Sequence, residues 1–239
     1  MMPPSQPLAL ASDPVWIARA KQHLRAQMRA VRGQLPAAAV AARSRRIVTA
    51  LCQLIDQHRP PSVALFAPLR HEVQLLPALV DEAASPAPTW LLPRIAGASE
   101  QTGTPAVMHS GEGLREQGLT LHIYSHDTAL QRGAFGVRQP PEDTPTMPDD
   151  AVAWVIAPAL AVDSDGCRLG YGGGHYDRLL ARLPHALVVV VAFDFQLLVE
   201  LPRAAHDRPG HVVVTDARVH WAAGRPPAPG SRPPTVAAP

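Results

Sequence analysis

The sequence AVAWVIAPALAVDSDGCRLGYGGGHYDRLLARLPHALVVVVAF, residues 151–193, carries the clearest structural signal in the chain. It contains two valine-rich apolar runs, 151–158 and 185–193, with a helical pattern over 175–183 between them. Near-continuous apolar runs of this kind are typical of strands that are covered on both faces. A strand, a helix and a second strand in this order predict a unit of an α/β sheet.

The chain on the N-terminal side of this unit continues the alternation. Strands are expected at 62–68, 88–94 and 119–124, and a helix at 74–83. We therefore predict a three-layer α/β/α sandwich around a mostly parallel sheet, as a single domain over residues 13–222.

Two amphipathic helices are predicted before the first strand. Asp13 followed by Pro14 is typical of a helix start, and this helix is expected to end near Arg32. Its apolar stripe consists of Ile17, Ala20, Leu24, Met28 and Val31. A neighbouring stripe, which is either a solvated face or countercharge for a polyphosphate, consists of Lys21, Arg25, Arg29 and Arg32. The second helix spans 37–58 and is expected to bury Val40, Ile47, Leu51, Leu54 and Ile55.

Three segments are predicted to lie outside the packed core. Residues 1–12 and 223–239 are rich in proline and alanine and are expected to form disordered tails. Residues 97–118 form a long polar, glycine-containing loop, and loops of that length are usually functional or mobile.

Composition narrows the class of protein. The chain has 239 residues, of which 46% are hydrophobic and 18% charged, and its formal net charge is +2. The pI near 8.8 is only mildly basic, so no nucleic-acid partner is expected. No apolar run is long enough to span a membrane, and the N-terminus lacks the features of an export signal. Cys52 and Cys167 are expected to be reduced thiols of a cytoplasmic protein.

Residues 168–177, RLGYGGGHYD, combine the parts of a phosphate-binding loop. Glycines between a strand and a helix let backbone N–H groups approach an anion, and the helix offers its positive end. Arg168 adds a guanidinium that can bind phosphate through two hydrogen bonds. Because the run matches neither the Walker pattern nor GxGxxG, a tight connection with a helix-capping acid is an equal alternative.

Three acidic residues lie where ligands bind in such folds. Asp177 either complements the dipole of the following helix or holds Mg²⁺ for a nucleotide. Asp207 lies in a proline-flanked loop, where a turn role is favoured from the residues alone. Glu72 follows the strand over 62–68 and either orients a polar ligand ring or caps the next helix.

Other reactive residues form no recognisable arrangement. The 11 histidines are scattered without HxH or HExxH spacing, which argues against a zinc site. Ser110, Ser125 and Ser164 lack the context of a nucleophile elbow, and Cys167 lacks a histidine partner in the sequence.

Taken in order, the motifs resemble those of the 5-formyltetrahydrofolate cyclo-ligases, also called methenyltetrahydrofolate synthetases. The segment APALAVDSDGCRLGYGGGHYDRLL is similar to the family signature, a strand followed by P, FD, G, RLG and G[KG]GYYD. Further segments that resemble family motifs are KQHLR at 21–25, FAPLRHEVQ at 66–74, LLPR at 91–94, GAFGVRQP at 133–140 and LPRAAHD at 201–207. The resemblance covers about residues 15–217.

The resemblance implies an ATP- and Mg²⁺-dependent ligase that converts 5-formyltetrahydrofolate to 5,10-methenyltetrahydrofolate, with release of ADP and phosphate. It implies that Lys21 and Arg25 contact the ATP phosphates and that Asp177 and Asp207 bind Mg²⁺. The residues implied to wrap the nucleotide are Arg168, Leu169, Gly170, Tyr171, Gly172, Gly173, Gly174, His175 and Tyr176.

The resemblance also implies a folate pocket and two catalytic residues. Glu72 would hold the pterin and Ala67 would line the same pocket, and the part of the loop from Tyr171 to His175 would also face the folate. Arg168 and Tyr176 would be catalytic. The expected partners are small molecules, and the protein is expected to be a monomer.

Three positions depart from the family pattern. Gly173 stands where the family often has lysine, so another cation must serve near the phosphate. His175 replaces the first tyrosine of YYD, and Gln74 replaces an acid, which leaves the second pterin contact open. Two alternatives therefore stand beside the ligase: a non-catalytic folate- or nucleotide-binding relative, and an α/β isomerase whose loop holds only a phosphate.

Overall fold

The structure is a computed structural model that describes residues 13–95, 118–133 and 136–222. Three predicted segments lie wholly or almost wholly outside these residues, namely 1–12, 97–118 and 223–239. The predictions for these segments therefore remain predictions.

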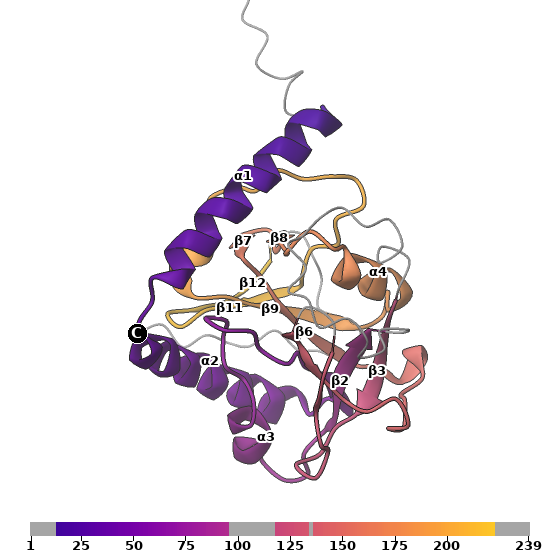
Figure 1. Ribbon diagram of the computed structural model, residues 1–239. Helices are drawn as coiled ribbons and strands as arrows, with labels where there is room; N and C mark the ends of the chain where they lie inside the picture. Colours follow the sequence, from indigo (N-terminus) through magenta and orange to yellow (C-terminus); the bar gives the residue numbers. More distant parts are fainter. Residues whose placement is uncertain (1–12, 96–117, 134–135, 223–239) are drawn as a thin grey trace, which may run out of the picture.

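A seven-stranded sheet forms the centre of the protein (Figure 1). In spatial order it consists of β12 (Val219–Trp221), β11 (Val212–Val214), β9 (Leu187–Val191), β6 (Trp154–Pro158), β1 (Ser62–Ala64), β2 (Thr89–Ile95) and β3 (Leu119–Ile123). The five strands from β11 to β2 are parallel, whereas β12 and β3 are antiparallel edge strands. The prediction of a mostly parallel sheet is confirmed.

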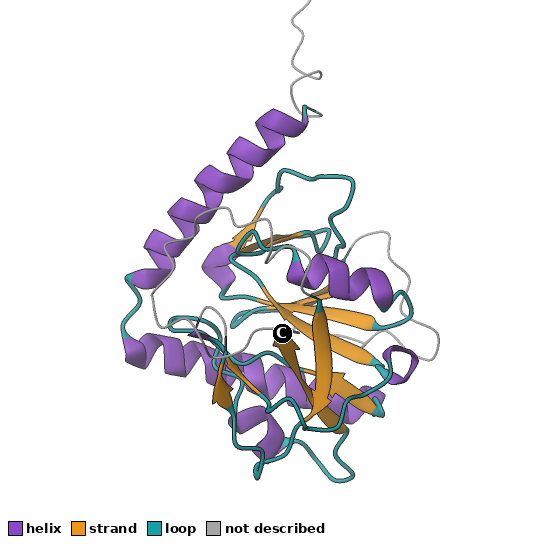
Figure 2. Ribbon diagram, turned by 45° about the vertical axis from the view of Figure 1, so that its right-hand side comes forward, coloured by secondary structure: helices purple, strands orange, loops and turns teal. Residues whose placement is uncertain are grey.

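Helices cover both faces of this sheet (Figure 2). On one face, α2 (Ala37–His58) and α3 (Ala78–Glu82) share an apolar cluster with the inner residues of the strands. On the other face, α4 (His175–Arg182) contributes Leu179 and Leu180 to a second cluster. Both predicted outer layers are therefore present, and all five residues predicted to be buried in α2 are buried.

Helix α1 (Pro14–Gly33) lies beside the sheet rather than on one of its faces (Figure 1). It begins as predicted, because the Asp13 side chain accepts a hydrogen bond from the Val15 N–H at 2.9 Å. Its Met28 packs with Leu160, Leu169 and Leu201 in a small separate cluster. The neighbouring three-stranded sheet consists of β10 (Leu197–Leu198), β7 (Ala161–Asp163) and β8 (Arg168–Leu169).

The buried face of α1 differs from the predicted apolar stripe. Val31, which belongs to the predicted apolar stripe, is 48% exposed. Lys21 and Arg32 are buried instead, because Lys21 pairs with Asp207 and Arg32 contacts Tyr171. The helix is therefore turned toward its positively charged stripe.

Several boundaries also differ from the prediction. Helix α3 begins at Ala78 rather than at residue 74, because Pro77 lacks an N–H group and disfavours helical backbone in the residue before it. Strand β1 ends at Ala64, although the chain stays buried to Ala67. The remaining elements are β4 (Gln131–Arg132), β5 (Arg138–Gln139) and the short 3-10 helices Asp149–Ala151 and Asp194–Gln196.

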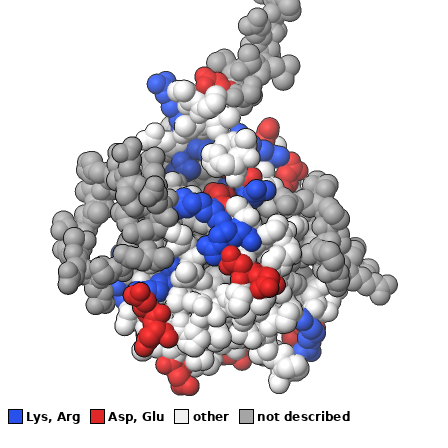
Figure 3. All heavy atoms as spheres, turned by 90° about the vertical axis from the view of Figure 1, so that its right-hand side faces the viewer, with Lys and Arg blue, Asp and Glu red and all other residues white. Residues whose placement is uncertain are grey.

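Both cysteines are free thiols, as predicted. Within the described residues, no helix is long and apolar enough to cross a membrane. On the face drawn in Figure 3, Lys and Arg side chains lie beside Asp and Glu side chains rather than in a separate basic region.

Candidate functional site

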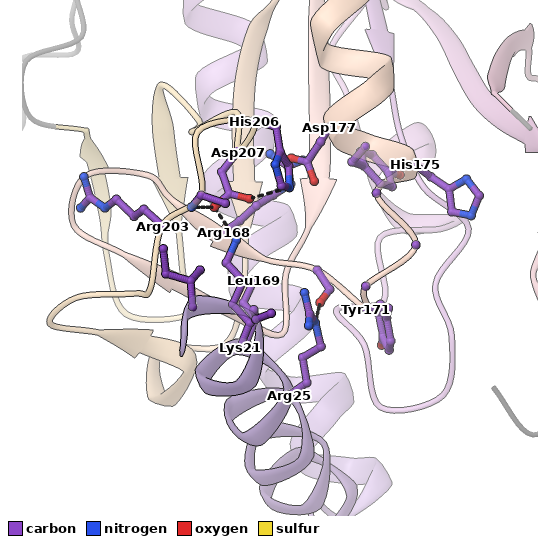
Figure 4. Close-up of a pocket in the computed structure, with 18 of the residues that line it drawn as sticks. Lys21, Arg25, Arg168, Leu169, Tyr171, His175, Asp177, Arg203, His206 and Asp207 are labelled. Carbon is purple, nitrogen blue, oxygen red and sulfur yellow. Dashed lines mark hydrogen bonds and ion pairs between the residues drawn. The ribbon is translucent and has the colours of Figure 1, made fainter. Parts of the chain in front are cut away.

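A cavity of about 810 Å³ lies between α1 and the glycine loop, residues 170–174, which joins β8 to α4 (Figure 4). Lys21 and Arg25 line it from α1, and every residue from Arg168 to Asp177 lines it from the loop and its flanks. Asp207 lines it from the segment between β10 and β11. All residues predicted to contact ATP and Mg²⁺ thus border one cavity.

The backbone of the glycine loop requires glycine at two positions. Gly172 has φ of 108° and Gly174 has φ of 65°, which side-chain-bearing residues rarely adopt. Gly174 is also the N-cap residue of α4. The loop therefore turns sharply into the positive end of a helix, as the phosphate-loop interpretation requires.

The arginines of α1 hold this loop. Arg25 Nε donates to the Gly170 carbonyl at 2.9 Å, and Arg29 Nη2 donates to the Tyr171 carbonyl at 3.1 Å. Burial, and then the neighbouring charge of Arg29, lower the pKa of Arg25. The positively charged stripe of α1 is therefore more than a solvated face, and an anion near Arg25 would relieve the repulsion between the two guanidinium groups.

Two ion pairs join the cations of the cavity to its carboxylates. Lys21 Nζ lies 2.5 Å from Asp207 Oδ2, and Arg168 Nη2 lies 2.7 Å from Asp177 Oδ1. We call these four residues the cavity cluster. The other oxygens, Asp177 Oδ2 and Asp207 Oδ1, accept no hydrogen bond within the described part of the chain, although His206 Nε2 lies 3.9 Å from Asp207 Oδ1.

The donor set of the cavity cluster fits Mg²⁺ that is bound together with a phosphate. Mg²⁺ prefers oxygen ligands and is usually held by one or two carboxylates plus phosphate oxygens and water. Asp177 and Asp207 each offer one oxygen at the cavity. Among residues 13–95, 118–133 and 136–222, no three His, Cys, Asp or Glu side chains gather as a metal site. Two carboxylates alone therefore make an incomplete site that phosphate oxygens would complete.

Glu72 and Ala67 are buried and do not line the cavity. Glu72 Oε2 accepts the Leu69 N–H at 2.7 Å, and Glu72 Oε1 accepts the Tyr171 hydroxyl at 2.6 Å. Arg32 also contacts the Tyr171 hydroxyl. Tyr171 thus connects the predicted folate residue to the glycine loop.

Gln74 stands where the family pattern has an acid, and its side chain makes structural contacts. Its Nε2 donates to the carbonyls of Leu69 and Glu72, at 3.2 and 2.9 Å. The side chain therefore stabilises the backbone that presents the Glu72 carboxylate.

Two partly buried tyrosines at the loop have raised pKa values. Burial, and then the charge of Glu72, raise the pKa of Tyr171 and of Tyr176. The Tyr176 ring lies 6.0 Å from the guanidinium carbon of Arg168. Both phenols are therefore hydrogen-bond donors at neutral pH, and Tyr176 helps to position Arg168.

Asp163 is a buried residue for which no role was predicted. Its Oδ1 accepts the N–H groups of Asp165 and Cys167, and its Oδ2 accepts the Leu201 N–H and contacts Arg203. It therefore joins the turn before the glycine loop to the segment that carries Asp207. Its match to the acid of the family's FD motif could have indicated its importance, but a motif does not predict hydrogen-bond partners.

Comparisons with known proteins agree with this geometry. A family model described as the 5-formyltetrahydrofolate cyclo-ligase family matches residues 17–216. This protein belongs to that family. The fold is also similar to the solved 5,10-methenyltetrahydrofolate synthetase of Aquifex aeolicus, with a TM-score of 0.69 and 29% identity, over 86% of this chain and 95% of that chain.

Two curated relatives match over shorter segments. The 5-formyltetrahydrofolate cyclo-ligase of Mycolicibacterium smegmatis is 42% identical over 82 residues, which are 33% of this chain and 41% of that protein. The 5-formyltetrahydrofolate cyclo-ligase of Escherichia coli (strain K12) is 33% identical over 99 residues, which are 40% of this chain and 54% of that protein. The chain thus spans about half the length of these curated relatives.

Proposed function

We propose that this protein converts 5-formyltetrahydrofolate to 5,10-methenyltetrahydrofolate with ATP and Mg²⁺, and releases ADP and phosphate. The observation that carries the proposal is the cavity at which the glycine loop, the cations of α1 and two carboxylates meet. Family membership supplies the reaction, and the cavity supplies room for a triphosphate.

The reaction must turn a poor leaving group into a good one. The formyl oxygen attacks the γ-phosphorus of ATP, and the bond between that phosphorus and ADP breaks. N10 of the folate then attacks the activated carbon, loses its proton and closes the ring as phosphate leaves. Alignment of the two substrates and neutralisation of the moving charge are the main demands on the protein.

The residues of the cavity match these demands. Lys21, Arg25 and Arg168 would neutralise phosphate oxygens, and the N–H groups of the glycine loop would donate to them. Asp177 and Asp207 would hold Mg²⁺, which when bound neutralises charge on the phosphate oxygens. When the nucleotide binds, the cations would turn from the carboxylates to the phosphates. The carboxylates would then have Mg²⁺ as their positive neighbour.

The folate would lie on the Glu72 side of the loop. A pterin N–H group would take the place of the Tyr171 hydroxyl at Glu72 Oε1, which lies 3.9 Å from the Arg32 guanidinium. The protein would act in the cytoplasm as a monomer on small-molecule substrates, without a nucleic-acid or membrane partner.

The test is the absorbance of the methenyl product after the protein is mixed with 5-formyltetrahydrofolate, Mg²⁺ and ATP. We expect the absorbance to rise only when both ATP and Mg²⁺ are present. Folate binding without product would indicate the non-catalytic relative. A protein that binds phosphate but neither folate nor ATP would indicate the isomerase alternative.

A further inference from the structure

Arg178 lies against the glycine loop. It is on the first turn of α4, and a Cβ atom built on Gly174 would lie 2.9 Å from its Nη1. At the other end of the loop, a Cβ atom built on Gly172 would lie 3.6 Å from the guanidinium carbon of Arg25. The glycines therefore admit a guanidinium group close to the backbone at both ends of the loop.

No carboxylate of the described residues forms an ion pair with Arg178. Lys21, Arg168 and Arg203 each form an ion pair with one or two aspartates. Within the described part of the chain, Arg178 forms no ion pair, and its buried Nε has no hydrogen-bond partner. An uncompensated cation beside a loop of N–H donors favours an anion at that loop.

Gly173 has a different reason to be glycine than its neighbours. Its φ is not positive, so its backbone would accept a side chain. A Cβ atom built on Gly173 would, however, lie 2.8 Å from Cδ2 and 2.9 Å from Nε2 of His175. The imidazole therefore occupies the space that a lysine side chain at 173 would enter.

His175 in turn holds Arg178. Arg178 Nη2 donates to His175 Nδ1 at 3.0 Å, so the neutral ring carries its proton on Nε2. The imidazole over Gly173 and the guanidinium against Gly174 thus form one unit on the loop.

We propose that Arg178 supplies the positive charge that this loop lacks at position 173, and that His175 positions it to stabilise the phosphates of a bound nucleotide. The proposal rests on the proposed function, because it takes the anion at the loop to be a nucleotide phosphate. At a separation of about 6 Å in a partly exposed site, one unit charge changes phosphate affinity by about tenfold.

The experiment measures the dissociation constant of Mg²⁺–ADP by calorimetry, at low and high salt. We expect Arg178→Gln to raise the constant about tenfold at low salt and by less at high salt, because salt screens the charge. Arg178→Lys should retain most of the affinity. Arg182→Gln is the matched control: Arg182 lies on the same helix but pairs with Asp149, so its loss should leave the constant within about twofold.

A charge-relocation variant separates electrostatics from packing. In the Arg178→Gln background, Gly173→Lys combined with His175→Ala removes the ring and returns a cation to the loop. We expect this triple variant to regain most of the lost affinity. Unchanged ADP binding by Arg178→Gln, or no recovery in the triple variant, would overturn the proposal.

Parallel assays of product formation distinguish the two proposals. If the wild-type protein binds ADP as expected but forms no methenyl product, the proposed function fails and the role of Arg178 stands. If product forms while Arg178→Gln binds ADP normally, the role of Arg178 alone fails. A wild-type protein that binds no ADP would contradict both.

Discussion

Two groups of paired charges can be compared in this protein, and only one of them borders the cavity. The first is the cavity cluster of Lys21, Arg168, Asp177 and Asp207. The second, which we call the edge cluster, follows β9 and β11 and consists of Arg43, Asp194, Thr215, Asp216 and Arg218. Both contain two aspartates paired with basic side chains, so the difference lies in how the carboxylate oxygens are used.

In the edge cluster, every carboxylate oxygen has a donor. Asp194 Oδ1 accepts from Thr215 and Arg218, and its Oδ2 accepts from Arg218. Asp216 accepts the Asp194 N–H at one oxygen and Arg43 at the other. Such saturation is typical of a structural network. Among the described residues, the cavity cluster leaves one oxygen of each aspartate without a hydrogen bond, and this difference distinguishes a candidate site from a structural ion-pair network.

The largest expected effect comes from Asp177→Asn. The variant keeps an oxygen that can accept from Arg168 but loses the charge that would hold Mg²⁺, so we expect turnover to fall at least about 100-fold. Product absorbance measures it. Asp194→Asn, the same change in the edge cluster, should leave turnover within about twofold. Similar turnover in the two variants would remove the distinction between the clusters.

Asp216→Ala, in the edge cluster, is expected to lower the stability of the protein rather than its activity. This substitution removes a buried carboxylate that accepts from the Asp194 N–H and from the partly exposed Arg43, so the free energy of unfolding should fall by about 2 kcal/mol. Urea denaturation followed by circular dichroism measures it. The Michaelis constant for ATP should not change, and a selective loss of ATP affinity would assign the edge cluster to the site.

A smaller effect on the cavity side is expected from Arg25→Ala. The loss of one half-buried cation and of its bond to the Gly170 carbonyl should raise the Michaelis constant for ATP about tenfold. The Michaelis constant for 5-formyltetrahydrofolate should change less. Arg19→Ala, an exposed arginine on the same helix, is the control. Equal effects of Arg25→Ala on both substrates would argue for a general loss of loop structure.

The smallest effect concerns pH and the edge cluster. Burial opposes ionisation of Asp194, but the hydrogen bonds from Arg218 and Thr215 outweigh it and lower its pKa below the ordinary value of 3.8. A lowered folded-state pKa contributes stability above the unfolded-state value, and this contribution is lost as the pH falls through the folded-state pKa. The wild-type protein should therefore lose up to about 1 kcal/mol more than Asp194→Asn between about pH 5 and 3. Urea denaturation of both proteins at the two pH values checks this. Equal losses in the free energy of unfolding would contradict it.

The sequence predicted the fold well where the signal was local. The valine-rich runs identified β6 and β9, and the helix start at Asp13 and the glycine run before α4 were read from adjacent residues. Residues brought together by folding could not be read in this way. Nothing near Arg32 in the sequence indicates that it is buried, because its partner Tyr171 is 139 positions away.

For the candidate site, the sequence named residues that border one cavity, but it did not predict their contacts. The motifs named Lys21, Asp177 and Asp207, and the structure brings them to one cavity. They did not indicate that the cations and carboxylates pair with one another, or that the Tyr171 hydroxyl donates to the Glu72 carboxylate. Such pairings depend on side-chain geometry, which spacing along the chain does not specify.

The ion pair between Lys21 and Asp207 has a consequence for biosynthesis, because its members are 186 positions apart. On the ribosome, α1 emerges long before the segment that carries Asp207, so the nascent chain holds one half of the cavity while most of the domain is still to be made. A chain released before residue 207 would retain the helix and the glycine loop without the closing carboxylate. Nucleotide capture would then be a property of the finished polypeptide, acquired only in the last steps of translation.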